Sequence, residues 1–261
     1  MHLPQPLIAL LLAGAVLASR GVAAQVAPDL PAVAKECGEA RFGDRPLPNS
    51  AAALQKHKRI KILAIGASST AVLGIGRNGN PPLLERILER TIKGLDVEII
   101  NRGFSGELAE AAGERLKIEV ALNQPDIVLW QVGTNDALAH VPVDSFEQSV
   151  GGTVRWLKQH SVDLLLVGLH YSKRLAKDSH YQAIRISLRR IATEENVLRI
   201  GRYEAMEVLA RTTASNGRPE LDDFGLTEAG YNCMAQYIAR TITVGLFAKP
   251  SKHSPMPDPG K

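Results

Sequence analysis

Three short segments of the 261-residue sequence carry groups suited to attack on a carbonyl carbon. They are Gly66-Ala67-Ser68, Asn101-Arg102-Gly103-Phe104-Ser105-Gly106 and Gly133-Thr134-Asn135-Asp136. The first supplies a serine hydroxyl as a nucleophile. The second and third supply a backbone N–H and an asparagine amide, which can donate hydrogen bonds to the negative oxygen that forms during attack. Each segment alone is a weak indication, because serine, glycine and asparagine are also common turn residues.

Each of these segments follows a predicted β-strand. Short apolar runs predict strands over residues 60–65, 97–100, 127–132, 164–169 and 197–200. Apolar residues at helical spacing predict helices over residues 82–93, 108–122, 146–160 and 181–191, and a last helix through Tyr231, Met234, Ile238 and Ile242. This alternation predicts an α/β architecture, with a parallel sheet covered on both faces. Because ligands bind at the carboxyl ends of the strands in such sheets, the three segments are expected to meet there.

In this order, the three segments resemble sequence blocks of the SGNH hydrolases, also called the GDSL lipase/esterase superfamily. The first resembles the G-D-S block with Ala67 in place of the aspartate, and residues 133–136 match the G-x-N-D block. The resemblance covers about residues 59–239. It implies a flavodoxin-like three-layer α/β/α sandwich with a central parallel five-stranded sheet. It also implies an enzyme that cleaves carboxylic ester bonds without a cofactor or a metal.

The resemblance assigns roles to individual residues. Ser68 is expected to be the nucleophile, and its own backbone N–H is expected to join the oxyanion hole. The Gly106 N–H and the Asn135 side chain would complete that hole. The expected substrates are small acyl or acetyl esters, including esters of glycans. Gly103 and Asp136 have structural interpretations instead, as part of a tight turn and as a local cap.

The fourth block of the family, D-x-x-H shortly before the last helix, is where the chain departs from the pattern. Aligning Gly230-Tyr231 with the family places Asp222 at the acid position and Gly225 where the base histidine belongs. No histidine occurs between His180 and His253. The departure matters, because loss of the histidine in a well-studied serine protease lowers turnover about 10⁶-fold.

Two other histidines follow strand ends and are candidates to replace the missing base. His170 comes directly after the fourth predicted strand, and His140 comes shortly after the third block. A polar residue that closes a strand or contacts substrate is the favoured interpretation of His170, with the base role as the competing hypothesis. His140 is the weaker candidate because its loop is long. The alternative function is a catalytically impaired protein that binds an ester, a glycan or a protein partner in the same pocket.

Composition and other motifs argue against further classes of function. The formal net charge is +4, without a basic tail or an aromatic-interleaved basic patch, so nucleic-acid binding is not expected. Residues 74–79 match G-x-G-x-x-G, the dinucleotide fingerprint. The match starts several residues after its strand and leads into Pro81-Pro82, so a nucleotide site is disfavoured. A loop beside Ser68 is the better interpretation.

The N-terminal residues have the features of an export signal. Leu7 to Leu17 form an apolar run, and Val22-Ala23-Ala24 offer small residues at a cleavage site. We therefore expect a signal peptide over residues 1–24 and a periplasmic or extracellular protein. The run is short for a bilayer span, so no membrane span is expected after cleavage, with an uncleaved N-terminal anchor as the alternative.

The remaining chain divides into an extended, proline-containing arm over 25–58, the hydrolase-type domain over 59–247 and a disordered tail over 248–261. In an oxidising compartment the two cysteines, Cys37 and Cys233, are expected to form one disulfide. Such a bond would clamp the arm onto the last helix. Two separate buried thiols are the alternative, and a metal site is not indicated because no further ligands lie nearby in the sequence.

Overall fold

The computed structural model describes residues 28–38, 43, 45–66, 82–215 and 228–248. Five strands form one sheet, in which every observed pairing is parallel and the order is β2-β1-β3-β4-β5. The strands are β1 (Arg59–Gly66), β2 (Asp96–Gly103), β3 (Ile127–Gln131), β4 (Asp163–Val167) and β5 (Leu198–Ile200). This order is that of flavodoxin-like folds, so the predicted α/β architecture is confirmed.

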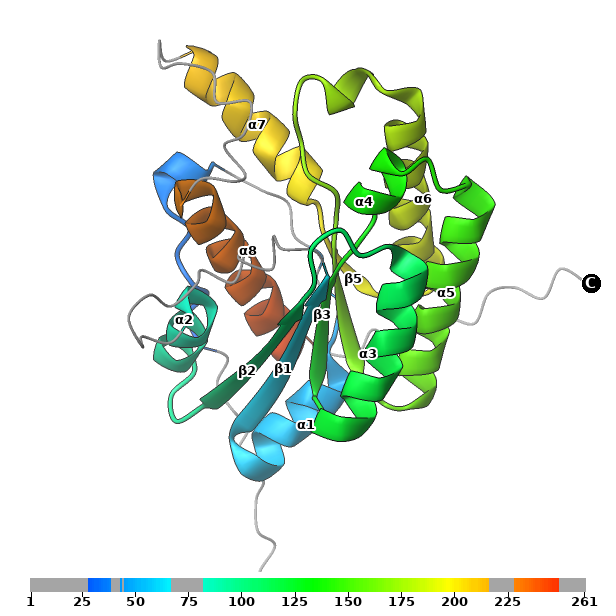
Figure 1. Cartoon of the computed structure of the whole chain (residues 1–261). Coiled ribbons are helices and arrows are strands. Elements are labelled where there is room, and N and C mark those ends of the chain that lie inside the picture. Colours follow the sequence, from blue (N-terminus) through cyan, green and yellow to red (C-terminus); the bar gives the residue numbers. More distant parts are fainter. Residues whose placement is uncertain (1–27, 39–42, 44, 67–81, 216–227, 249–261) are drawn as a thin grey trace, which may run out of the picture.

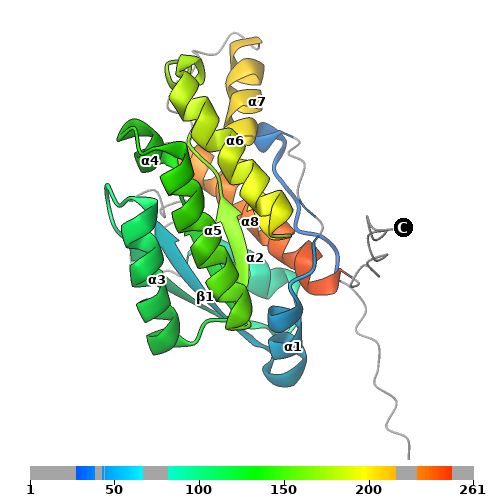
Figure 2. The same cartoon turned by 90° about the vertical axis from the view of Figure 1, so that its right-hand side faces the viewer.

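Helices cover both faces of the sheet (Figures 1 and 2). On one face lie α2 (Leu83–Thr91) and α8 (Glu228–Phe247), and on the other lie α3 (Ala109–Asn123), α5 (Val143–Gln159) and α6 (Ser179–Glu194). The short helix α4 (Thr134–Leu138) follows β3, and α7 (Arg202–Ser215) follows β5. The three layers bury strands β1, β3 and β4 from both sides, which explains their near-continuous apolar sequences.

The largest difference from the sequence-based expectation lies in the region predicted to be an extended arm. Residues Pro48–His57 form helix α1, which begins with proline at its first turn, a position that proline favours. Its start is capped by Asp163 of β4, whose carboxylate accepts hydrogen bonds from Ser50 N at 2.8 Å, Ser50 Oγ at 2.7 Å and Asn49 Nδ2 at 2.9 Å. The cap comes from 113 residues away, so the local sequence does not reveal it.

Helices α4 and α7 were also not predicted. Helix α4 has only five residues, too few to show a helical period. Helix α7 does carry a signal, because its buried residues Tyr203, Met206, Leu209 and Ala210 recur every three or four positions.

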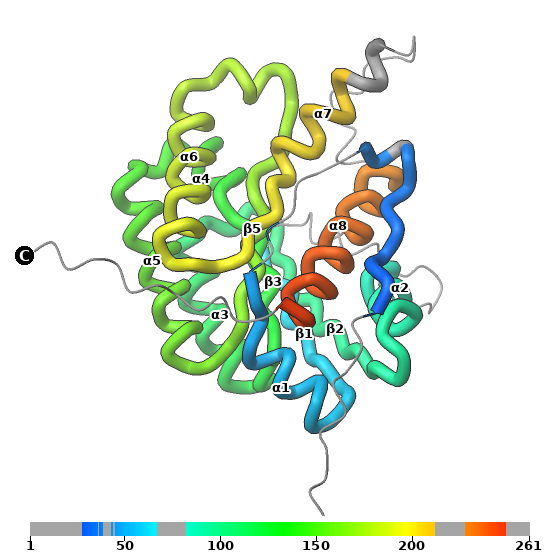
Figure 3. Tube along the Cα trace, turned by 180° about the vertical axis from the view of Figure 1, so that it is seen from behind, coloured from blue at the N-terminus to red at the C-terminus, as the bar shows by residue number. Residues whose placement is uncertain are grey.

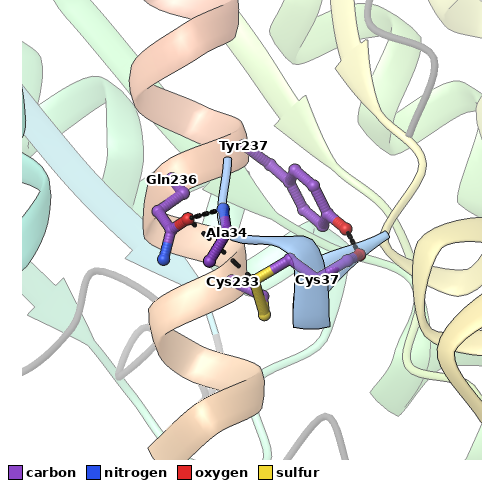
Figure 4. Close-up of a disulfide and its surroundings, with 5 residues drawn as sticks. All are labelled: Ala34, Cys37, Cys233, Gln236 and Tyr237. Carbon is purple, nitrogen blue, oxygen red and sulfur yellow. Dashed lines mark hydrogen bonds between the residues drawn. A yellow bond between two sulfur atoms is a disulfide. The ribbon is translucent and has the colours of Figure 1, made fainter. Parts of the chain in front are cut away.

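The arm that precedes α1 is tied to α8 (Figures 3 and 4). Cys37 and Cys233 form the predicted disulfide, and both cysteines are buried. Around it, Ala34 N donates to Gln236 Oε1 at 2.7 Å, Tyr237 Oη donates to the Cys37 carbonyl, and Arg240 Nη1 donates to the Pro31 carbonyl at 3.2 Å. The arm is thus part of the folded unit.

The disulfide closes a loop between positions 196 residues apart, so its removal should destabilise the protein. The chain-entropy argument sets an upper figure of about 5 kcal/mol, and measured losses are often about 2–4 kcal/mol. The double variant Cys37→Ser/Cys233→Ser should unfold at a lower urea concentration than the wild type.

The same variant provides the control for reductant. Dithiothreitol should lower the urea midpoint of the wild type and leave that of the double variant unchanged. An unchanged midpoint in the double variant without reductant would contradict the stabilising role of the bond.

Candidate active site

The strand order creates a crevice at the carboxyl ends of β1 and β3. From β1 the chain passes outward to β2 on one side, and from β3 it passes outward to β4 on the other. At such a switch point the connecting loops diverge, which leaves room for a ligand. Gly66 of the first segment ends β1, and the second and third segments lie at the carboxyl ends of β2 and β3, so these residues converge on this crevice. Ser68 itself lies outside the described residues, as do Asp222, Gly225 and residues 74–79.

Gly66, the last residue of β1, pairs with Gln131 of β3 and adopts a φ of +133°. A Cβ at this position would lie 2.3 Å from the Gln131 carbonyl oxygen. Only glycine permits both this backbone conformation and this close approach. The glycine of the first block therefore allows β1 to run alongside β3 up to the last residue of β1.

The turn after β2 is held against the end of β1. The Gly103 N–H donates to Asn101 Oδ1 at 2.9 Å, and the Phe104 N–H donates to the Gly66 carbonyl at 2.7 Å. Gly106 adopts a φ of +80° in open surroundings, so its backbone conformation, and not a lack of space, favours glycine. Gly103 itself is the last residue of β2 and pairs with Gly66 of β1, so the tight turn expected at Gly103 lies just beyond it, at Ser105 and Gly106.

The third segment folds as a tight turn at Gly133, whose φ is +103°, followed by α4. Asn135 Nδ2 donates to the Glu107 carbonyl at 2.9 Å, and Asp136 Oδ1 accepts from the Ala109 N–H at 2.8 Å. Asp136 is therefore a cap, as expected, but it caps the start of α3. Burial raises the pKa of its carboxyl above the ordinary value, against the lowering effect of this hydrogen bond.

These contacts form a small pocket at the sheet edge. Its lining combines the ends of β1 and β3 with the starts of α3 and α4: Gly66, Glu107, Leu108, Ala109, Ala112, Trp130, Gln131, Val132, Gly133, Thr134 and Asn135. Asn135 thus lies in the pocket, and Gly106 directly precedes a residue that lines it. The structure brings together the second and third segments as the sequence predicted.

His170 and His140 both lie near this edge, in different surroundings. His170 is buried. Its backbone N–H donates to Thr134 Oγ1 at 3.0 Å, and its backbone carbonyl accepts from Tyr181 Oη at 2.5 Å. Burial raises the pKa of the Tyr181 hydroxyl to about 12, so it remains a neutral donor. His140 is exposed, with its ring centroid 5.1 Å from that of His180. Because Ser68 lies outside the described residues, a base role for either histidine remains a prediction.

Three charged residues were not singled out in the sequence, two beside the pocket and one at the carboxyl end of β5. Glu107 accepts the Asn135 amide through its backbone and pairs with Arg115 through its carboxylate. Arg202, at the start of α7, is buried, and burial lowers its pKa to about 10, so the guanidinium remains charged at neutral pH. Only tertiary packing identifies Glu107 and Arg115, since an acid and a base eight positions apart are unremarkable in sequence.

Within the described part of the chain, no group of three or more His, Cys, Asp or Glu side chains is arranged to hold a metal ion. Among the same residues, no helix has the length and apolar character that a membrane crossing requires.

The close approach at Gly66 gives a stability prediction. Gly66→Ala should lower the free energy of unfolding by about 3 kcal/mol, because the added methyl group meets a backbone carbonyl and the φ is strained. Gly152→Ala is the matched control, since Gly152 lies in α5 with open space around its Cβ position. The control should be neutral or stabilising by up to about 1 kcal/mol. Equal urea midpoints for the two variants would contradict the close approach.

Comparison with known proteins gives matches at the levels of family and fold. The sequence profile of the non-GDSL lipase-like family matches residues 35–247. Esterase TesA of Pseudomonas aeruginosa is 26% identical over 109 residues, which are 41% of this chain and 53% of TesA. The chain therefore matches about half the length of that relative.

Solved structures match over most of their length at low identity. A GDSL-family lipolytic protein from Desulfitobacterium hafniense has a TM-score of 0.51 at 22% identity, over 70% of this chain and 99% of that one. A variant of Axe2, an acetyl xylan esterase from Geobacillus stearothermophilus, has a TM-score of 0.56 at 20% identity, over 70% and 94%. The lipase/acylhydrolase from Enterococcus faecalis has a TM-score of 0.55 at 23% identity, over 73% and 98%. At these identities the likeness concerns the fold.

Proposed function

The chain belongs to the non-GDSL lipase-like family, and from this premise we propose that it is a serine hydrolase of the SGNH type that cleaves small acyl or acetyl esters, including esters on glycans. The family profile matches from residue 35 onward, so it includes most of the arm that was expected to precede the domain. Ala67 stands where the G-D-S block has its aspartate, in agreement with the description of the family as non-GDSL.

The observation that carries the proposal is the orientation of the Asn135 amide. One N–H of Asn135 Nδ2 donates to the Glu107 carbonyl. The same nitrogen bears a second N–H, and a planar amide whose first N–H is held fixes the direction of the other. A donor fixed in advance at the place where negative charge develops is the requirement for stabilising an oxyanion.

In the proposed reaction, Ser68 Oγ attacks the ester carbonyl carbon, and the carbonyl oxygen becomes negative. The N–H groups of Ser68 and Gly106 and the side chain of Asn135 hold this oxygen. The intermediate then expels the alcohol, and water hydrolyses the acyl-enzyme to release the acid. A base must accept the Ser68 proton and pass it to the oxygen of the departing alcohol, and it must then take a proton from the attacking water and return it to Ser68 as the acid leaves. Asp222 would normally orient a histidine at position 225, which here is Gly225, so His170 is the proposed substitute.

We further propose that the protein is exported, with residues 1–24 as the signal peptide, to a periplasmic or extracellular location. The Cys37–Cys233 disulfide supports this proposal, because structural disulfides persist mainly in oxidising compartments.

Hydrolysis of p-nitrophenyl acetate by matched variants tests the proposal. Ser68→Ala should remove most of the turnover and leave only the small acceleration that binding and the oxyanion hole supply. Asn135→Ala should lower turnover about 10²- to 10³-fold, because one oxyanion donor is lost. His170→Ala should lower turnover, because His170 is the proposed base. His160 is exposed and directly follows the C-terminal end of α5, shortly before β4 begins. His160→Ala is therefore the control and should leave turnover unchanged.

The variant Gly225→His separates the enzyme from the impaired binding protein. Turnover that appears only when Gly225→His is introduced would favour the alternative of a pocket that binds without hydrolysing. Wild-type turnover that is unaffected by Ser68→Ala would show that the nucleophile is assigned incorrectly.

A further inference from the structure

The ion pair between Glu107 and Arg115 differs from the other ion pairs of α3. Arg115 Nε lies 2.7 Å from Glu107 Oε1, and Arg115 Nη2 lies 2.6 Å from Glu107 Oε2. The Glu107 side chain is 7% exposed and that of Arg115 is 28% exposed. The hydrogen bond to Glu107 raises the pKa of Arg115, so its guanidinium stays charged. Two parallel bonds from a planar guanidinium set the orientation of the carboxylate as well as its distance.

The other ion pairs that α3 makes within the described residues are more exposed or have one contact. Lys117 Nζ lies 2.6 Å from Glu114 Oε1, and the Glu114 side chain is 71% exposed to solvent. Arg102 Nε makes a single contact of 3.1 Å with Glu119 Oε2, and the Arg102 side chain is 46% exposed. Exposed single contacts of this kind contribute little to stability or order. The bidentate, largely buried pair therefore constrains the turn before α3 to an extent that the other two do not.

The backbone attached to Glu107 carries the expected oxyanion donors. Gly106 directly precedes Glu107, and the Glu107 carbonyl accepts the Asn135 amide. Two residues later, the Ala109 N–H is held by Asp136. Movement of the Glu107 backbone would therefore displace the Gly106 N–H and release the Asn135 side chain together.

We propose that Glu107 and Arg115 are positioning residues of the site: their ion pair holds the Gly106–Glu107 backbone and, through the Glu107 carbonyl, the orientation of the Asn135 amide. Neither side chain contacts the reacting atoms in this scheme. The catalytic meaning of the inference rests on the proposed function, whereas the positioning of Asn135 does not.

Nuclear magnetic resonance of the ¹⁵N-labelled protein tests the positioning without a substrate. The side-chain NH₂ signals of Asn135 are assigned by their loss in Asn135→Asp, and their hydrogen exchange is measured. In Arg115→Met and Glu107→Gln we expect exchange of the N–H that donates to Glu107 to accelerate at least tenfold. Arg115→Lys should give an intermediate value, because lysine keeps the charge without the fork. Lys117→Met, which breaks an exposed pair on the same helix, should match the wild type.

Exchange rates of Asn135 that stay within twofold of the wild type in both Arg115→Met and Glu107→Gln would overturn the inference. The backbone signals of α3 report whether a variant is folded. If Arg115→Met unfolds, Glu107→Gln decides the question, because glutamine keeps the size and the backbone of residue 107 while removing the charge.

Ester hydrolysis measures the catalytic consequence. In Arg115→Met and Glu107→Gln, kcat should fall about tenfold with KM changed less than twofold, because oxyanion donors act on the transition state more than on bound substrate. Lys117→Met should leave both constants unchanged. An unchanged kcat in variants whose Asn135 exchange has accelerated would refute the catalytic part. A wild type without Ser68-dependent turnover would refute the proposed function, and the exchange measurement would still decide the positioning.

Discussion

The close contact between β1 and β3 at Gly66 is the constraint on which the rest of the site depends. The absence of a side chain there lets the backbone of Gly66 pass within van der Waals range of the Gln131 carbonyl. The two central strands therefore stay paired to their carboxyl ends, where the chain diverges toward β2 and β4. The segment that contains Ser68 and the helix that contains Asn135 begin on either side of this contact. A bulkier residue would separate them at the point where their groups must converge.

Two hydrogen bonds then join the neighbouring turns into one unit. Asn135 and Asp136, adjacent in sequence, hold the Glu107 carbonyl and the Ala109 N–H. Because one side chain donates and the other accepts, the pair fixes both the position and the direction of the turn before α3. Rigid placement of donors matters more for an oxyanion site than for ordinary binding, since the site must not reorganise while charge develops.

The expected oxyanion donors and the expected base belong to separate parts of the chain. Gly106 and Asn135 follow β2 and β3, in turns held at the ends of β1 and β3, whereas the family's acid and base positions correspond to Asp222 and Gly225, just before α8. Loss of a base therefore need not disturb the donors. In serine hydrolases, an oxyanion hole and binding alone retain about 10³–10⁴-fold acceleration over water. A chain of this family can thus keep a functional pocket while its proton transfer changes or weakens.

The amino-acid sequence alone predicted the parallel sheet and the meeting of the second and third segments at its carboxyl edge. The expected pairing of Cys37 with Cys233 came from their being the only two cysteines of a chain expected to be exported, and the structure shows that bond. Apolar runs and helical periods are local properties, and each strand end carries its own turn residues, so the sheet and the segments at its edge follow from short stretches of chain. Only the tertiary structure decided that α1 forms under the Asp163 cap and that Glu107 links Arg115 to Asn135. Those features depend on partners brought together by folding, and pairs of common polar residues far apart in sequence carry no periodic signal.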